Sequence, residues 1–302
     1  MSVSLAETPA AVAAPTRPAA APSPSVALAA FSLAQRELVR FFRQRTRVVG
    51  ALVQPVLFWV VLGAGMRSAF DAPAYADGLD MTYQAYFLPG VAAMIVLFTA
   101  IFATISVIED RREGFLQGVL VAPVPRAGIV LGKVLGGAAI AFLQAGLFVA
   151  LAPLLNLVGL APGVQFLFEQ GGFDVASALL TAGWIALLSV GLTALGYCMA
   201  WPLDSTQGFH ALMSVVLLPM WLLSGAAFPA DEGWLKWVVA ANPLTYGVAG
   251  LRRAMTPALA DVPATLTLPG AGVAALVFGG FTLACLIVAV LITRRRHPRE
   301  AR

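Results

Sequence analysis

The chain has 302 residues, and 60% of them are hydrophobic while only 11% are charged. Ordinary soluble domains carry about 25% charged residues, so this composition excludes a soluble globular protein. It predicts an all-α polytopic membrane protein, because long apolar runs with internal Gly and Pro favour helices over a membrane β-barrel. The net charge of +4 follows from basic segments beside the membrane and requires no nucleic acid as a partner.

The N-terminal part of the chain divides into a polar tail and a basic helix. Residues 1–25 are rich in Ala, Pro, Ser and Thr, and we expect them to form a disordered tail. In residues 30–47, apolar side chains such as Phe31 and Phe42 recur at helical spacing, while arginines occupy another face. This pattern predicts an amphipathic interfacial helix, with its aromatic rings in the acyl boundary and its arginines at anionic headgroups. A plain basic flank of the first membrane span is the alternative.

Six apolar runs are long enough to cross a membrane, which takes about 20 residues. They lie within residues 48–296, which we expect to form one transmembrane domain. The predicted spans cover about residues 48–66, 86–108, 128–153, 175–200, 208–228 and 270–292. The third span carries Gly128, Gly132 and Gly136 at intervals of four. Small residues at that spacing share one helical face and predict close packing against another helix.

The basic residues predict how the chain is oriented. Fifteen of the 19 Lys and Arg residues lie before the first span, between the second and third spans, at Lys133 in the base of the third span, or after the last span. Positive residues concentrate on the cytoplasmic side of membrane proteins. Both termini and the segment at residues 109–126 are therefore expected in the cytoplasm.

The segment at residues 109–126 is charged and punctuated by prolines between two apolar runs. We interpret it as a surface on which a soluble partner pushes. No predicted span holds an acid at mid-depth, where ion-coupled transporters usually carry one, so an outside source of energy is favoured. The glycines before Lys133 are one residue too close for a phosphate-binding loop and lack its Ser or Thr. The chain also lacks a Cys/His cluster, so we expect no catalytic residue, metal or cofactor on it.

The longest external segment, residues 229–269, lies between the fifth and sixth spans. Its apolar pieces are too short to cross the membrane. Trp234, Trp237 and the pair Arg252 and Arg253 are typical of interfacial or re-entrant helices. These four residues are candidates for contact with lipid headgroups or with a substrate. For the two arginines we favour a headgroup anchor over an anionic substrate.

Several pieces of the chain, in their order and spacing, resemble one known family. They are Gln54-Pro-Val-Leu-Phe-Trp59, Tyr86-Phe-Leu-Pro-Gly90, Glu109-Asp-Arg-Arg-Glu-Gly114, Leu120-Val-Ala-Pro-Val-Pro-Arg126, Leu223-Ser-Gly-Ala-Ala-Phe-Pro229 and Asn242-Pro-Leu-Thr-Tyr246. Over residues 30–296 the chain resembles the permease subunits of type-2 ABC transporters, chiefly the bacterial exporter branch.

The resemblance implies half of a transporter in the bacterial inner membrane. Two permease copies, identical or different, would pair with two cytosolic ABC ATPase subunits on separate chains. The resemblance also implies a cytoplasmic coupling helix within residues 109–126 and short external re-entrant helices between spans five and six. The substrate would be hydrophobic or amphipathic: a drug-like molecule, a lipid or a lipid-linked saccharide. An ion-coupled secondary transporter or channel acting without an ATPase is the alternative, whereas an intramembrane enzyme lacks any catalytic constellation.

Residues of the implied coupling helix can be assigned roles. Phe115 and Leu116 would be apolar anchors in a groove of the ATPase, and Arg111, Arg112 and Glu113 would form the polar rim of that contact. Phe115→Asp is then expected to uncouple ATPase activity from transport while leaving membrane insertion intact. ATPase activity and export both at the wild-type level would refute this assignment.

Overall fold

A computed structural model describes residues 25–294, except residues 123, 170–171 and 230–232. The predicted disordered tail, apart from Ser25, and the arginines beyond Arg294 lie outside the described residues. The described part is helical and contains no strand. Its helices are α1 (Val26–Arg43), α2 (Arg45–Gly65), α3 (Tyr83–Arg112), α4 (Phe115–Val121), α5 (Arg126–Leu157), α6 (Gln165–Glu169), α7 (Val175–Ala200), α8 (Thr206–Leu222), α9 (Leu235–Ala241), α10 (Pro243–Met255) and α11 (Ala271–Arg294).

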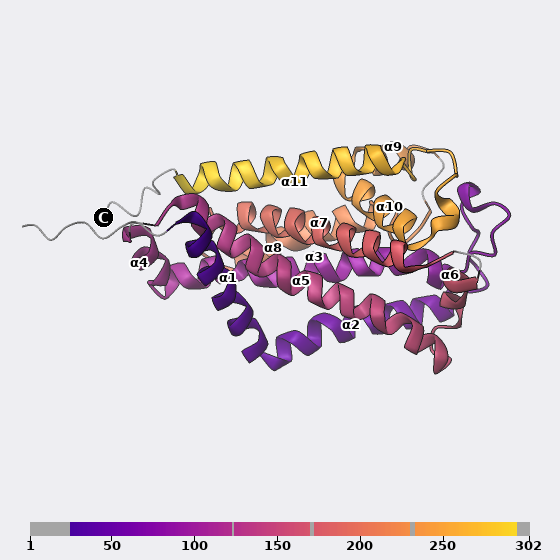
Figure 1. The fold of residues 1–302 in the computed structure, drawn as a ribbon, viewed down its shortest axis with the longest axis horizontal. Helices are drawn as coiled ribbons and strands as arrows, with labels where there is room; N and C mark the ends of the chain where they lie inside the picture. Colours follow the sequence, from indigo (N-terminus) through magenta and orange to yellow (C-terminus); the bar gives the residue numbers. More distant parts are fainter. Residues whose placement is uncertain (1–24, 123, 170–171, 230–232, 295–302) are drawn as a thin grey trace, which may run out of the picture.

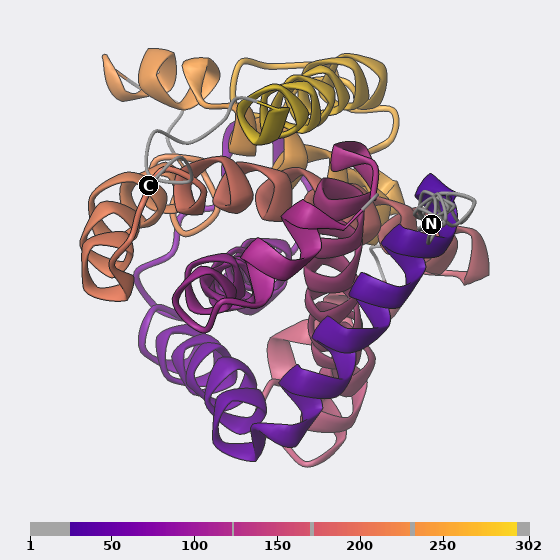
Figure 2. The ribbon, with the colours of Figure 1, turned by 90° about the vertical axis from the view of Figure 1, so that its left-hand side faces the viewer.

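The long helices run side by side along one axis of the molecule (Figure 1). The end-on view in Figure 2 places α3 inside a ring of other helices, and α2, α5, α7, α8 and α10 all pack against it. In the most apolar stretch of α3, 83% of the residues are buried, compared with 22% in α11. The apolar surface of α3 is therefore covered by protein, whereas α11 leaves most of its surface uncovered.

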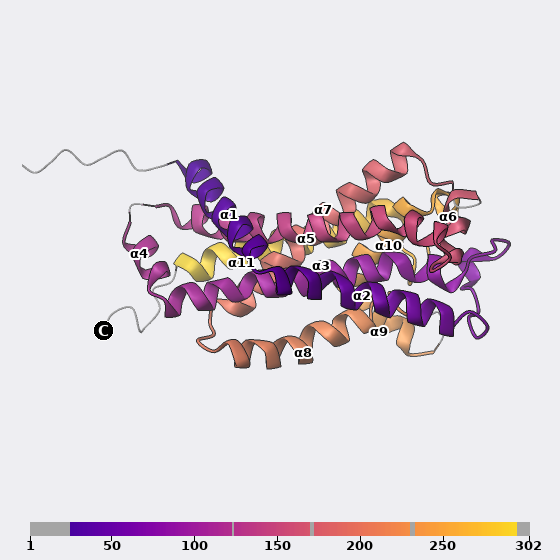
Figure 3. The same cartoon turned by 90° about the horizontal axis from the view of Figure 1, so that it is seen from below.

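Among the residues that the structure describes, four helices, α3, α5, α7 and α11, are long and apolar enough to cross a membrane. The other two predicted spans correspond to α2 and α8, which run alongside the bundle (Figure 3). Both are shorter in their apolar part, over Leu52–Gly65 and Thr206–Leu222. Helix α2 continues through Pro55. The all-α polytopic class is confirmed, and the count of six spans stays a prediction.

The glycine face of α5 receives α1. A Cβ atom on Gly132 would lie 2.6 Å from Leu33 Cβ and 2.9 Å from Ala30 O, and Gly128 and Gly136 approach α1 in the same way. Side-chain carbons do not tolerate such distances, so only glycine lets the two backbones come this close. The close packing predicted for this face is therefore observed, and its partner is the N-terminal basic helix.

Helix α1 carries three different faces. One packs on α5 and includes Ala30, Leu33 and Glu37, which are buried. A second bears arginines, and a third keeps Leu28, Phe31, Val39 and Phe42 exposed. An exposed apolar stripe beside a basic one is the pattern of an interfacial helix. The interfacial position of α1 stays a prediction.

We define two ends of the bundle from Figure 1. The α4 end carries α4, the start of α1 and the end of α11, whereas the α10 end carries α6, α9 and α10. At the α10 end, Asn242 caps α10 by accepting a hydrogen bond from Leu244 N at 3.0 Å, and it donates one to Leu223 O at 2.9 Å. Tyr86 donates to Gly225 O at 2.8 Å, so the start of α3 is tied to the turn after α8. The two short helices expected between the fifth and sixth spans are present as α9 and α10.

Candidate functional site

The segment expected to meet a partner forms α4, a seven-residue helix at one tip of the bundle (Figure 1). Gly114 separates it from α3 and has φ +80°, a conformation that favours glycine. The chain therefore turns sharply within a few residues of the last turn of α3. Because the predicted second span ended at residue 108, the sequence placed Glu109 to Arg112 outside the helix. In the structure these charged residues form the last turn of α3.

Ion pairs join α1 to this last turn of α3. Arg36 makes a two-pronged contact with Asp110, with nitrogen–oxygen distances of 2.8 and 3.0 Å. Arg40 reaches Asp110 at 2.8 Å, Glu109 at 3.0 Å and Glu113 at 3.4 Å. Charge-assisted forked contacts of this kind fix geometry as well as adding energy. Helix α1 is therefore held against the segment from which α4 departs.

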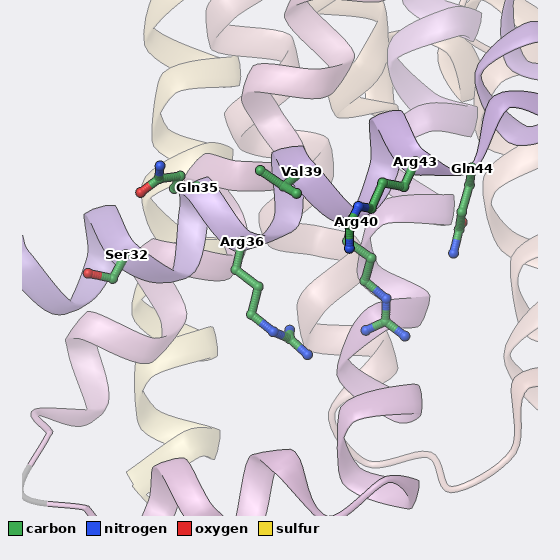
Figure 4. A pocket seen from close by; sticks show the side chains of 7 residues that line it. All are labelled: Ser32, Gln35, Arg36, Val39, Arg40, Arg43 and Gln44. Atoms are coloured by element: carbon green, nitrogen blue, oxygen red, sulfur yellow. The ribbon is translucent and has the colours of Figure 1, made fainter.

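The arginine face of α1 borders a cavity of about 530 Å³. Figure 4 shows Arg36 and Arg40 extending to the same side of the helix. The other residues that line the cavity are Ser32, Gln35, Val39, Arg43 and Gln44. Burial lowers the pKa of the Arg36 guanidinium, but the hydrogen bond and the charge of Asp110 more than offset this, so the pKa lies above its usual value.

The predicted rim residues differ in how they are placed. Arg111 donates hydrogen bonds to Trp201 O at 2.7 Å and to Leu203 O at 3.1 Å, so it ties α3 to the turn between α7 and α8. Arg112 and Glu113 are exposed. Arg111 therefore stabilises the chain internally, and Arg112 and Glu113 remain open to a partner.

The two predicted apolar anchors are turned toward the protein itself. Leu116 is 2% exposed and packs in the hydrophobic core. Phe115 is half-buried, and the Arg36 guanidinium lies 3.8 Å from the centre of its ring. The side chains that α4 leaves open are instead Gln117 and Val121, and Val121 is 88% exposed. A partner docking on α4 would meet this face before it met Leu116.

At the α10 end, the predicted external residues fall into two groups. Trp234 and Trp237 are exposed beside and within α9, at 74% and 62%. Arg252 and Arg253 are buried at the end of α10 and donate to backbone carbonyls and to the Tyr75 hydroxyl. The sequence suggested that these two arginines face lipid headgroups. In the structure they are buried and donate their hydrogen bonds within the protein. The tryptophans keep the exposed position expected of an external contact.

Sequence reasoning missed one cluster at the α4 end. Lys133 of α5 is buried and donates hydrogen bonds to two buried carboxylates, Glu37 of α1 and Asp110 of α3. A signal was present, because Glu37 shares a face of α1 with the apolar residues Ala30 and Leu33, and Lys133 stands in an apolar helix. Buried charges of opposite sign require partners, but the sequence did not show which residues they would meet.

Comparison with known proteins identifies the family. Residues 29–256, which run from the first turn of α1 to the end of α10 and include α4, match the family described as ABC-2 type transporter. The chain belongs to this family. It is a transport permease and a multi-pass membrane protein, the transmembrane rather than the catalytic component.

Relatives of this ABC-2 permease share about a quarter of its residues. A putative transport permease, ycf38, of Cyanophora paradoxa is 25% identical over 225 residues, which cover 74% of this chain and 72% of the relative. The probable doxorubicin resistance ABC transporter permease protein DrrC of Mycobacterium tuberculosis is 25% identical over 218 residues, with coverages of 72% and 73%. Nodulation protein J of Rhizobium leguminosarum bv. viciae is 26% identical over 213 residues, with coverages of 69% and 74%.

Proposed function

We propose that this ABC-2 permease is the transmembrane subunit of an ATP-driven exporter, and that a separate cytosolic ATPase docks on the α4 end. One observation carries the proposal: α4 is anchored from behind by Leu116 and by Arg36 over Phe115, while its outer face stays open. A short helix fixed on one side and free on the other suits a contact that transmits force. The free face presents Gln117 and Val121, with Arg112 and Glu113 beside it.

The complete transporter would contain two copies of the permease and two ATPase subunits in the bacterial inner membrane. The first described residue of α1 and the last of α11 lie at the α4 end, which supports cytoplasmic termini. The exposed apolar stripe of α1 would rest in the lipid interface on that side. Hydrolysis of ATP would take place on the partner, and we propose no resident cofactor on this chain.

The substrate class is hydrophobic or amphipathic: a drug-like molecule, a lipid or a lipid-linked saccharide. The relative named for doxorubicin resistance supports the drug-like option. We expect transport to require the partner, because no described helix that could span the membrane carries an acid at mid-depth to couple to an ion gradient.

Affinity purification of the full chain in mild detergent should recover an ATPase, identified by mass spectrometry. Val121→Asp should lower the recovered ATPase several-fold, because it places a charge on the most exposed apolar position of α4. Leu266→Asp changes an exposed apolar residue in the loop before α11 and is the matched control. Recovery should be unchanged in that variant, and membrane insertion should be normal in both.

Two results would overturn the proposal. One is equal recovery of ATPase with Val121→Asp and with the wild type. The other is accumulation of a solute by the purified chain alone, in liposomes with an ion gradient, which would favour an ion-coupled transporter. Phe115→Asp is a poorer probe, because it also removes the ring under Arg36.

A further inference from the structure

We propose that Lys133 is a positioning residue for α4, acting through Asp110 and Arg36 on Phe115. This inference rests on the proposed function, because it assigns to these residues the passage of movement from the docked ATPase into the bundle. The chain of contacts joins one residue on each of α5, α3, α1 and α4.

The first link is the ammonium group of Lys133. Its side chain is 3% exposed, and Nζ lies 2.6 Å from Glu37 Oε1 and 3.2 Å from Ser106 Oγ. The third contact is a hydrogen bond to Asp110. An ammonium has three protons to donate, so the three acceptors match its capacity. Lys133 is fixed by α1 and α3 together.

The second link is the Asp110 carboxylate, which is fully buried. Its Oδ2 accepts from Lys133 and Arg36, and its Oδ1 accepts from Arg36 and Arg40. A buried carboxylate is tolerated only when it is paired and fully hydrogen-bonded. Because all these donors converge on one group, movement of any one of them changes the contacts of the others.

The third link joins the network to α4. The Arg36 guanidinium donates two hydrogen bonds to Asp110 and stands over the ring of Phe115, the first residue of α4. Gly114 provides a hinge between α3 and α4, so the direction of α4 does not follow from the axis of α3. The direction of α4 must instead be set by the contacts that its first residues make. Arg36 supplies the polar one and Leu116 the apolar one.

Helix α1 is also held by packing that lies outside this network. The glycine face of α5 holds α1 by backbone contact along Gly128, Gly132 and Gly136. Loss of the Lys133 charge should therefore leave the bundle assembled while loosening α4. This separation makes a positioning role testable apart from a structural one.

The first measurement is the distance distribution between spin labels on Gln117→Cys in α4 and Leu143→Cys in α5, with Cys198 and Cys285 changed to serine. Both labelled positions are exposed. The distribution should be narrow in this background and broader after Lys133→Met, which removes the charge but keeps an unbranched chain. Arg36→Lys should broaden it too, since it keeps the charge but loses the flat group over Phe115. Lys236→Met, at the α10 end, should leave it narrow.

The second measurement uses the permease with its copurified ATPase. Lys133→Met should leave the amount of bound ATPase unchanged but lower substrate-stimulated hydrolysis by about three- to tenfold. An unchanged distance distribution in either Lys133→Met or Arg36→Lys would overturn the inference, because the chain of contacts runs through both residues. If Lys133→Met does not fold, Arg36→Lys alone decides, because that side chain is partly exposed. Failure to recover any ATPase with the wild type would refute the proposed function, and the spin-label distances would still decide whether Lys133 positions α4.

Discussion

Replacing Gly132 by alanine should destabilise the permease, although alanine is the better helix former. The new methyl group would meet Leu33 Cβ at 2.6 Å and Ala30 O at 2.9 Å. Neither atom is the end of a flexible side chain, so α1 must move away from α5. Overpacking of this kind costs about 1–3 kcal/mol. We expect a lower apparent melting temperature in detergent and faster proteolysis between α1 and α2.

The same substitution elsewhere on α5 provides the control. A Cβ on Gly146 would meet nothing within 4 Å, and alanine is favoured over glycine inside a helix by up to about 1 kcal/mol. Gly146→Ala should therefore leave the melting temperature unchanged or raise it slightly. Equal melting temperatures for the two variants would show that close contact between α1 and α5 is not what stabilises this part of the fold.

Arg253→Met should open the loop that precedes α11. The Arg253 guanidinium donates to Leu259 O, to Val262 O and Leu268 O at 3.2 Å each, and to Pro269 O at 3.1 Å. Methionine fills much of the same space but donates nothing, so these carbonyls would lose a shared donor. A hydrogen bond to a charged group contributes about 1.5–3 kcal/mol. The four bonds share one guanidinium whose burial itself costs free energy, so their contributions do not add. We expect the free energy of unfolding to fall by about 2–4 kcal/mol.

Two further variants separate charge from geometry at this position. Arg253→Lys keeps the charge but has three donors on one nitrogen instead of a planar fork, so it should restore only part of the stability. Arg67→Met removes an exposed arginine and should have no effect. The rate of proteolysis of the full chain in lipid nanodiscs measures how far the loop opens in each variant. If Arg253→Met resists proteolysis as well as the wild type, the carbonyls do not depend on this side chain.

The features that repeat along the sequence were predicted well. Five predicted spans coincide with helices to within about four residues at each end, because their apolar runs are long and are bounded by turn residues. The short helix within residues 109–126 was implied by the family resemblance, and α4 lies there, between Gly114 and the prolines before α5. The fifth span was predicted to reach residue 228, but α8 ends at Leu222, shortly before Gly225, whose φ of +69° is not helical.

The features that depend on partners far apart in the chain could not be predicted. Lys133 meets Glu37 across 96 positions, and Arg252 meets Tyr75 across 177. The local sequence pattern indicates that such charges need partners, but it does not indicate which distant residues these partners are. Leu116 was expected to face the ATPase because it is apolar in a charged loop. Its burial follows from the sharp turn at Gly114, which directs the start of α4 back onto the bundle.

The position of Lys133 in the chain has a consequence for biosynthesis. Glu37 and Asp110, its two carboxylate partners, precede it by 96 and 23 positions. Since a chain emerges from the ribosome N-terminus first, both acceptors already exist when this lysine arrives with α5. Arg253 is in the opposite situation, because the carbonyls that receive it, from Leu259 to Pro269, are made afterwards. Lys133 can therefore pair with a carboxylate as soon as α5 is synthesised. Arg253 must remain hydrated until the rest of its loop has been translated.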